Sequence, residues 1–218
     1  MNVKRRGLLL AFEGIDGTGK SSQINLLAAT LTQLGCQVVT TREPTDGVHG
    51  RKIRALFTSR ESLSPPEELA LFMADRREHV RLVIEPALLS GQIVLTDRYY
   101  LSTAAYQGAN GQDPEAIIVA NELFAPVPDL VLLLTMTPAQ GIHRIRALRG
   151  EVLNDFEQEE ALTRVAAIFA RLDRPYIARI DAAGSLLEVR AAVEARVLQL
   201  LQTENFTTGP RGAQFGKG

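Results

Sequence analysis

Residues Gly14 to Ser21, GIDGTGKS, have the composition and spacing of a loop that binds phosphate. They match G-x-x-x-x-G-K-[S/T] in full, with an apolar run before them and a helical pattern after them. Glycines let backbone N–H groups point at an anion, and the N-terminus of the next helix adds a favourable dipole. Lys20 would place a charge at the outer phosphates, and the Ser21 hydroxyl would enter the shell of a Mg²⁺ ion. An ordinary glycine-rich turn is the alternative, which the strand and helix patterns on either side disfavour.

Charged residues also follow two later apolar runs, in TREPTDG (Thr41 to Gly47) and TDRYYLSTAAYQG (Thr96 to Gly108). Asp97 could reach a Mg²⁺ shell, and the fork of Arg98 could span two phosphates. Alone, the first segment is interpreted as a turn, and the second fits a surface ion pair as well as it fits a catalytic site. A phosphate loop at a neighbouring strand end favours the catalytic interpretation of Asp97 and Arg98.

Arg76 lies in the middle of the apolar stripe of a helix predicted to begin at Ser64. The stripe recurs at helical spacing in Leu69, Phe72, Met73, Val80, Val83, Ile84 and Ala87. A guanidinium is always charged, so on an apolar face it needs an anionic partner. That partner is either a carboxylate at the end of the sheet, such as Asp97, or a phosphate on a second substrate. Phe72, one turn earlier, is either a core residue or a platform on which a base stacks.

A cluster of arginines, Arg144, Arg146 and Arg149, lies in a later helical pattern, GIHRIRALRGE. It is either a solvated helix face or a cationic flap over a phosphoryl group in transfer. Phosphoryl transfer spreads negative charge over the moving group, and the phosphate loop itself offers only Lys20. We therefore expect a further catalytic cation to come from Arg98 or from this cluster.

Alternating apolar runs and helical patterns must position these residues. Strands are predicted at Leu8–Phe12, Gln37–Thr41, Ile93–Thr96, Leu130–Thr135 and Ala178–Asp181. Helices are predicted over Lys20–Leu34, from Ser64 toward Gly91 with a bend at Pro86, from Thr137-Pro138, from a capping box at Asn154 to Glu157 toward Arg174, and over Leu186–Leu201. The pattern predicts an α/β fold, a parallel five-stranded sheet with helices on both faces. Such sheets bind ligands at the carboxyl ends of their strands, where the charged segments lie.

The composition of the 218 residues excludes several other classes. A net charge of −1 gives no reason to expect a nucleic-acid partner, and no apolar stretch approaches the length of a membrane span. The lone Cys36 suits a reducing cytoplasm, and the spacing of His49, His79 and His143 does not indicate a metal site, so these are interpreted as surface or structural. We expect one domain over residues 1–202 and a flexible polar tail over 203–218.

Among proteins with phosphate loops, GTPases carry an N-K-x-D motif that recognises guanine, and this chain lacks that motif. Arginines near several strand ends favour a kinase whose acceptor is itself phosphorylated. Such an acceptor needs no general base, because the second pKa of a phosphate monoester is about 6 and its oxygens are mostly ionised at neutral pH.

The chain resembles the thymidylate kinases from Leu8 to about Leu201, in FEGIDGTGKSS, TREPTDG, LFMADRREH, DRYYLSTAAYQG, PDLVLLLTMTP and the arginine-rich segment ending in FEQEE. The resemblance implies a phosphate-loop nucleotide kinase fold and a homodimer. It implies transfer of phosphoryl from ATP to dTMP with Mg²⁺, in the synthesis of dTTP.

The resemblance also implies roles for individual residues. ATP would be bound by Gly14, Ile15, Asp16, Gly17, Thr18, Gly19, Lys20, Ser21 and Ser22, with Ser21 and Asp97 at the metal. The acceptor would be bound by Glu43, Pro44, Phe72, Arg76, Arg98, Thr103, Tyr106 and Gln107. Phe72 would stack on thymine, Thr103 would bond the base edge, and Tyr106 would disfavour a 2′-hydroxyl. Lys20, Arg98 and Asp16 would act at the phosphates.

The phosphate loop has no arginine, as in the bacterial branch of the family, which supplies a catalytic arginine from a lid, here expected around residues 141–157. That lid usually contains D-R-x-E, where this chain has LNDFE (Leu153 to Glu157), and G-G-T usually follows the proline in EPTDGVHG. Arg149, Arg146 or Arg144 is therefore expected to supply the charge. The alternatives are a kinase of another nucleoside monophosphate or a deoxynucleoside, and a nucleotide-binding protein with weak catalysis.

Overall fold

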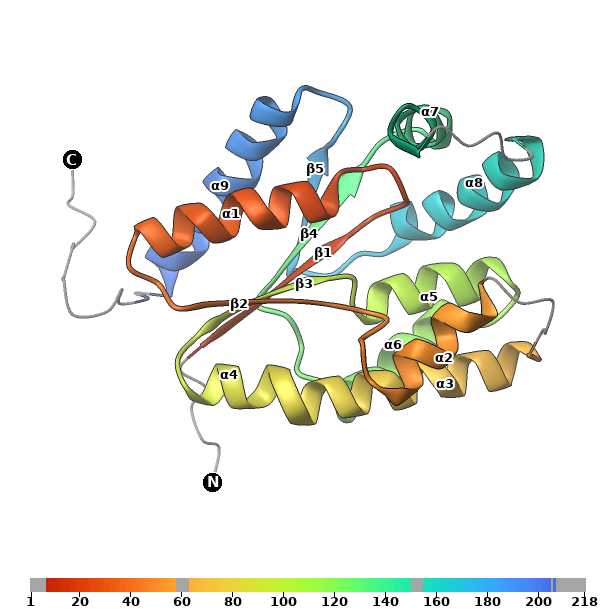
Figure 1. Ribbon diagram of the computed structural model, residues 1–218, viewed down its shortest axis with the longest axis horizontal. Coiled ribbons are helices and arrows are strands. Elements are labelled where there is room, and N and C mark those ends of the chain that lie inside the picture. The colour runs from red at the N-terminus through yellow and green to blue at the C-terminus, as the bar shows by residue number, and fades with distance from the viewer. Residues whose placement is uncertain (1–6, 58–62, 150–154, 205, 207–218) are drawn as a thin grey trace.

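The computed structural model describes residues 7–57, 63–149, 155–204 and 206. In these residues five parallel strands form one sheet in the order β2-β3-β1-β4-β5 (Figure 1). The strands are β1 (Leu8–Glu13), β2 (Val38–Arg42), β3 (Ile93–Asp97), β4 (Leu130–Thr135) and β5 (Ile177–Asp181). The helices are α1 (Lys20–Gln33), α2 (Val48–Leu56), α3 (Pro65–His79), α4 (Glu85–Leu89), α5 (Tyr100–Ala109), α6 (Pro114–Glu122), α7 (Pro138–Arg149), α8 (Asp155–Arg171) and α9 (Leu186–Thr203), with a π-helical turn η1 (Val80–Ile84). The predicted fold class is confirmed.

The central strand β1 is buried on both faces, and its alternating side chains enter two separate cores. Leu9 and Ala11 pack with residues of η1, α4, α5, α6 and α8, whereas Leu8, Leu10 and Phe12 pack with α1 and α9. Figure 1 shows α1 and α9 together on one side of the sheet and α3 to α6 on the other. Helices on both faces leave the carboxyl ends of the strands open for a site.

The long helix predicted from Ser64 is present but divided. The carboxylate of Glu67 accepts a hydrogen bond from the backbone N–H of Ser64, as a capping box requires. The π-helical turn η1 ends two residues before Pro86, where a bend was predicted. Pro86 has no N–H for the carbonyl of Leu82, so the regular helical hydrogen bonding is interrupted there.

Three short helices, α2, α5 and α6, were not predicted as helices. Helix α2 has only nine residues and buries only Gly50 and Ile53, so its apolar face is too short to show a clear helical repeat in the sequence. Helix α5 is buried almost throughout, which removes the contrast between faces on which a periodicity argument depends. The predicted capping residue Asn154 lies outside the described residues, and α8 begins at Asp155.

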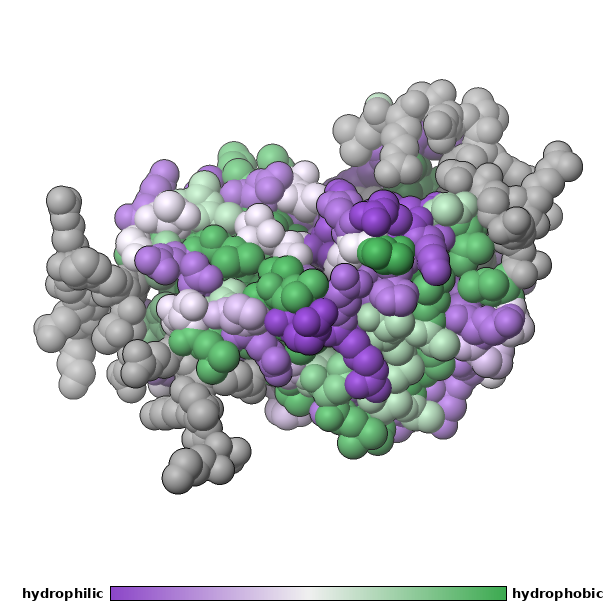
Figure 2. Space-filling model, turned by 60° about the horizontal axis from the view of Figure 1, so that its bottom comes forward, coloured by the Kyte–Doolittle hydropathy of each residue, from purple (hydrophilic) through white to green (hydrophobic). Residues whose placement is uncertain are grey.

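The described helices include none that is both long and apolar enough to cross a bilayer. Large hydrophobic side chains nevertheless reach the surface on the side of α4 and α6, among them Leu89 and Leu123. Figure 2 brings the lower side of Figure 1 forward and shows hydrophobic and hydrophilic residues interspersed over it.

Candidate active site

The predicted phosphate loop joins β1 to α1 and has the backbone that its glycines permit. Gly14, Gly17 and Gly19 have φ angles of 131°, 85° and 87°, which side chains other than glycine rarely adopt. A Cβ on Gly17 would lie 2.3 Å from the carbonyl oxygen of Gly141 at the start of α7. The loop is therefore shaped both by its own turn and by close contact with the segment expected to form the lid.

Lys20 lies at the first position of α1, and its side chain turns back over the loop. Its Nζ donates to the carbonyl oxygens of Gly14 and Ile15, both at 3.0 Å. Thr18 donates to the same Ile15 carbonyl at 2.9 Å and braces the turn. Burial lowers the pKa of Lys20 to about 8, with a smaller contribution from the charge of Arg98. A phosphate entering the loop would compete for this ammonium group.

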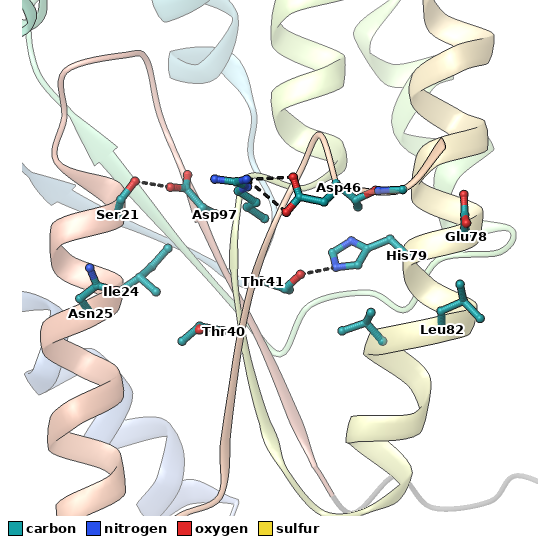
Figure 3. A pocket seen from close by; sticks show the side chains of 14 residues that line it. Ser21, Ile24, Asn25, Thr40, Thr41, Asp46, Glu78, His79, Leu82 and Asp97 are labelled. Carbon is teal, nitrogen blue, oxygen red and sulfur yellow. Dashed lines mark hydrogen bonds and ion pairs between the residues drawn. The ribbon is translucent and has the colours of Figure 1, made fainter. Parts of the chain in front are cut away.

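Two oxygen-bearing side chains that could bind a metal ion lie beside the loop. Ser21 Oγ, in the first turn of α1, donates to Asp97 Oδ2 at 2.6 Å, and Asp97 is the last residue of β3 (Figure 3). A hydroxyl and a carboxylate are ligands that suit Mg²⁺, which binds proteins through a few oxygens and completes its shell with phosphate and water. The described residues form no cluster of three or more His, Cys, Asp or Glu side chains around a metal. The predicted pair Ser21 and Asp97 thus lies together, beside the phosphate loop.

Arg98 follows Asp97 directly and has an unusual backbone, with φ at 72°. Its N–H donates to the carbonyl of Phe12, and its own carbonyl accepts from Thr96. The guanidinium donates to Ser102 Oγ at 2.8 Å and to Asp16 Oδ1 at 2.6 Å. These contacts hold the side chain between the phosphate loop and α5.

Asp16, inside the loop, is the carboxylate that Arg98 contacts. Displacement of water around Asp16 opposes its ionisation, but the charges of Arg98 and Lys20 outweigh this and lower its pKa. Tyr106 of α5 also donates to Asp16, at 3.3 Å, and its ring lies 5.0 Å from the guanidinium carbon of Arg98. Asp16, Arg98 and Tyr106 therefore form one polar group at the mouth of the loop.

Glu13, at the end of β1, was not predicted as a site residue. It is fully buried and accepts from the backbone N–H groups of Tyr99 and Ser102, at 2.9 and 3.0 Å, and from the Ser102 hydroxyl. Burial raises the pKa of Glu13 to about 7, although these hydrogen bonds and the charge of Arg98 favour the ionised form. The signal in the sequence was a charged residue that ends an apolar strand immediately before the glycine loop.

A pocket of about 360 Å³ opens next to this polar group. Its lining includes every residue predicted for the acceptor together with Asp16: Glu43, Pro44, Phe72, Arg76, Arg98, Thr103, Tyr106 and Gln107. Sequence reasoning missed the other lining residues, Phe57, Glu68, Tyr99, Ser102 and Asn110. Phe72 is half-buried and lines this cavity, so it is available to a ligand in the pocket rather than enclosed in the core. The predicted residues come from the phosphate loop, the segment after β2, helix α3, the turn after β3 and helix α5, and they meet only in the fold.

The guanidinium of Arg76 is paired with a carboxylate at the wall of this pocket. Its Nε donates to Glu43 Oε2 at 2.9 Å, Nη1 donates to Asn121 Oδ1 at 2.7 Å, and Nη2 donates to Thr103 Oγ1 at 2.9 Å. The side chains of Arg76 and Glu43 are 1% and 4% exposed. Of the predicted alternatives, a carboxylate at the sheet end is therefore confirmed as a partner, and it is Glu43 rather than Asp97. Since the arginine also lines the pocket, it remains next to any ligand bound there.

The three arginines of the expected lid, Arg144, Arg146 and Arg149, lie on α7. Arg144 donates to the carbonyl oxygens of Ala183 and Gly184, at 3.2 and 3.1 Å, after β5. Arg146 is half-buried, and the side chain of Arg149 is outside the described structure. Arg144 thus points toward the β5–α9 connection in this structure, away from the acceptor pocket on α3 and α5.

A parallel sheet with a phosphate loop, a magnesium-type oxygen pair and a second pocket joined to them by Arg98 defines a phosphate-loop nucleotide kinase. A protein-family model described as thymidylate kinase matches residues 12–193. The chain belongs to the thymidylate kinase family.

Individual relatives agree with the family match. The chain is 52% identical to a thymidylate kinase of Desulfotalea psychrophila over 90% of this chain and 96% of the relative. It is 49% identical to that of Akkermansia muciniphila, over 87% of this chain and 91% of the relative. For a thymidylate kinase of Xanthomonas campestris pv. campestris the identity is 46%, over 89% of this chain and 85% of the relative.

The buried Glu13 predicts a pH dependence of stability. Its pKa of about 7 lies above the ordinary value of 4.5, so the folded protein holds a proton that the unfolded chain releases. This contribution to the free energy of unfolding is complete below about pH 4.5 and is lost as the pH rises through 7. The loss is on the order of 3 kcal/mol, because one pKa unit corresponds to about 1.4 kcal/mol. Glu13→Gln stays neutral, and we expect its unfolding free energy to fall less between pH 5 and 8.

Urea unfolding followed by circular dichroism at several pH values would measure this difference. The exposed Glu159→Gln serves as the control and should follow the wild-type profile. Parallel profiles for Glu13→Gln and the wild type would show that Glu13 does not titrate in this range.

Proposed function

We propose that this protein transfers the γ-phosphoryl group of ATP to dTMP, forming dTDP and ADP. The observation that carries the proposal is the position of Arg98, whose guanidinium contacts Asp16 of the phosphate loop and lines the acceptor pocket. A planar fork can bind two phosphates at once, which is what transfer between two phosphate groups requires. Family membership supports the choice of dTMP as acceptor.

On the donor side, the backbone N–H groups of Gly14–Ser22 and the ammonium of Lys20 would bind the β- and γ-phosphates. Ser21 and Asp97 would hold Mg²⁺, which neutralises charge on those phosphates when bound. The short contact between Ser21 and Asp97 supports this assignment, since both oxygens already point at one place.

On the acceptor side, thymine would stack on Phe72, and its polar edge would face Arg76 and Thr103. Pro44 and Gln107 would enclose the base and sugar, and Tyr106 would crowd the 2′ position. Arg76 supports this arrangement, because Glu43, Asn121 and Thr103 orient it while its side chain still lines the pocket. The roles come from the resemblance to the family, and the presence of all these residues in the lining of one cavity supports them.

In the reaction, an oxygen of the dTMP phosphate attacks the γ-phosphorus, the bond to the bridging oxygen breaks, and ADP leaves. No general base is required, because the attacking oxygen is already ionised near neutral pH. Lys20 and Arg98 would offset the charge that spreads over the moving group, and Asp16 would keep Arg98 aimed at the loop before the substrates bind.

We also propose that residues 1–202 form one domain, in which residues 141–157 act as a lid, and that 203–218 form a tail. The close contact of Gly141 with the phosphate loop supports this, because a lid that begins there would start next to the phosphates of a nucleotide bound in the loop. Arg144 contacts carbonyls after β5, so Arg146 and Arg149 are the better candidates for a cation near the γ-phosphate. The buried, unpaired Cys36 suits an enzyme that works in the reducing cytoplasm.

A panel of nucleoside monophosphates in a coupled ADP-release assay would test the function. We expect dTMP to be phosphorylated with kcat/KM at least about tenfold above dCMP, UMP and AMP, since the pocket would discriminate by buried hydrogen bonds. Equal or better turnover of dCMP, UMP or AMP would refute the choice of acceptor. Tight binding of ATP and dTMP in calorimetry without product would indicate a nucleotide-binding protein instead.

Arg98→Ala should lower kcat on the order of a hundredfold, with KM for ATP changed by less than about threefold. The reason is that its charge matters most when negative charge spreads in the transition state. Steady-state kinetics with ATP and dTMP varied separately would measure this, with Arg196→Ala on the exposed face of α9 as the control. A rise in KM at unchanged kcat would contradict the bridging role.

The protein is further proposed to be a homodimer. Exposed leucines support this, because Leu89 of α4 and Leu123 beside α6 line one surface hollow and are 57% and 83% exposed. We expect light scattering after gel filtration to give the mass of two chains for the wild type and of one chain for Leu123→Glu. Leu187→Glu on α9, at a leucine that is 69% exposed, should remain a dimer. A monomeric wild type would exclude the proposal.

A further inference from the structure

His79 is the last residue of α3 and is only 3% exposed. Its ring lies between two elements of the site, with Nδ1 2.9 Å from Glu43 Oε1 and Nε2 2.7 Å from Thr41 Oγ1 on β2. Figure 3 shows the contact with Thr41 at the wall of a second hollow, of about 600 Å³, which His79 also lines. The ring thus separates this hollow from Glu43 and the acceptor pocket.

The chemistry of Glu43 determines which ring nitrogen carries the hydrogen. Burial opposes ionisation of Glu43, but the charge of Arg76 and the contact with His79 outweigh it and lower its pKa. An ionised carboxylate only accepts hydrogen bonds, so Nδ1 of His79 must be the donor. In the neutral ring Nε2 then accepts from the Thr41 hydroxyl, and both ring nitrogens are satisfied.

The two oxygens of Glu43 are divided between two residues of one helix. Oε1 faces His79, and Oε2 accepts from Arg76, one turn earlier on α3. The same helix also holds the next part of the loop, since Asp75 Oδ2 accepts from the backbone N–H of Thr45 at 2.9 Å. Without His79, Oε1 would lose its partner in a buried place, and the carboxylate could turn away from Arg76.

We propose that His79 is a positioning residue for the acceptor: it orients Glu43, and through Glu43 it fixes the guanidinium of Arg76 in the acceptor pocket. The inference rests on the proposed function, since it assumes that dTMP occupies that pocket. Arg76 lines the pocket, and Glu43, the one charged group among its partners Glu43, Asn121 and Thr103, helps to set the angle of its guanidinium. In the donor site, Lys20 is positioned by its hydrogen bonds to Gly14 and Ile15, which do not involve His79. Replacement of His79 should therefore affect the binding of the acceptor and not that of ATP.

The test compares His79→Leu, which removes both hydrogen bonds, with His79→Asn, whose amide nitrogen can reach the position of Nδ1. We expect His79→Leu to raise KM and the calorimetric Kd for dTMP about tenfold, the value of a hydrogen bond to a charged group, with KM for ATP changed less than about twofold. His79→Asn should recover most of the dTMP affinity, because it restores the donor to Glu43. Thr41→Val, which removes only the partner of Nε2, should change the Kd for dTMP by no more than about threefold.

A double-mutant cycle with Glu43→Gln shows whether His79 affects the Kd for dTMP through Glu43 or through a general disturbance of core packing. In the Glu43→Gln background, replacing His79 by Leu should add less than about a twofold change in Kd for dTMP. A full tenfold change in that background, or equal Kd values for the Leu and Asn variants, would overturn the proposal. So would a rise in KM for both substrates together.

Thermal unfolding of each variant shows whether the fold is intact. If His79→Leu does not fold, a folded His79→Asn still tests the proposal, because a loss of dTMP affinity of about tenfold in this variant, which keeps the donor to Glu43, would overturn it. Failure of the proposed function would be seen separately, as a wild-type enzyme that does not phosphorylate dTMP.

Discussion

The organisation of the site depends on one guanidinium, that of Arg98, which lies between the phosphate loop and the neighbouring pocket. The backbone achieves this because β1 and β3 are parallel neighbours, with Phe12 in register with Asp97. The carbonyl of Phe12 then accepts from the N–H of Arg98, and Glu13 accepts from Tyr99 and Ser102 on the far side of it. An arginine with a positive φ is tolerated because the residues on both sides are held by hydrogen bonds.

The two ion pairs of the site, Arg76 with Glu43 and Arg98 with Asp16, differ in how far they are exposed to water. Arg76 and Glu43 are almost entirely buried, so removing either one would leave the other charge buried without its opposite charge. Arg98 and Asp16 are 18% and 56% exposed, and water can replace either partner as a phosphate arrives. The buried pair is suited to shape the pocket, and the more exposed pair is suited to exchange partners during binding.

Several parts of this organisation could be predicted from sequence. The strands β1, β3 and β4 are continuous apolar runs, and their ends carry the loop, Asp97 and Arg98, so a site at that edge followed from parallel topology. The roles of Phe72, Thr103 and Tyr106 came from resemblance to a family, and their convergence on one cavity agrees with it. Helices α5 and α2 escaped prediction because the first is buried on nearly all sides, polar residues included, and the second is too short to show a clear helical repeat.

The sequence by itself determined the class of chemistry, because a phosphate loop is a local structure whose glycines, lysine and serine act within a few residues of one another. It also showed that Arg76 needed an anion, since a guanidinium in an apolar stripe implies one. Only the tertiary structure decided that this anion is Glu43, that His79 holds the other oxygen of Glu43, and that Glu13 supports the turn at Arg98. These partners lie 33, 36 and 86 positions apart along the chain, and side chains so far apart meet only when the sheet order brings β1, β2 and β3 together against α3 and α5.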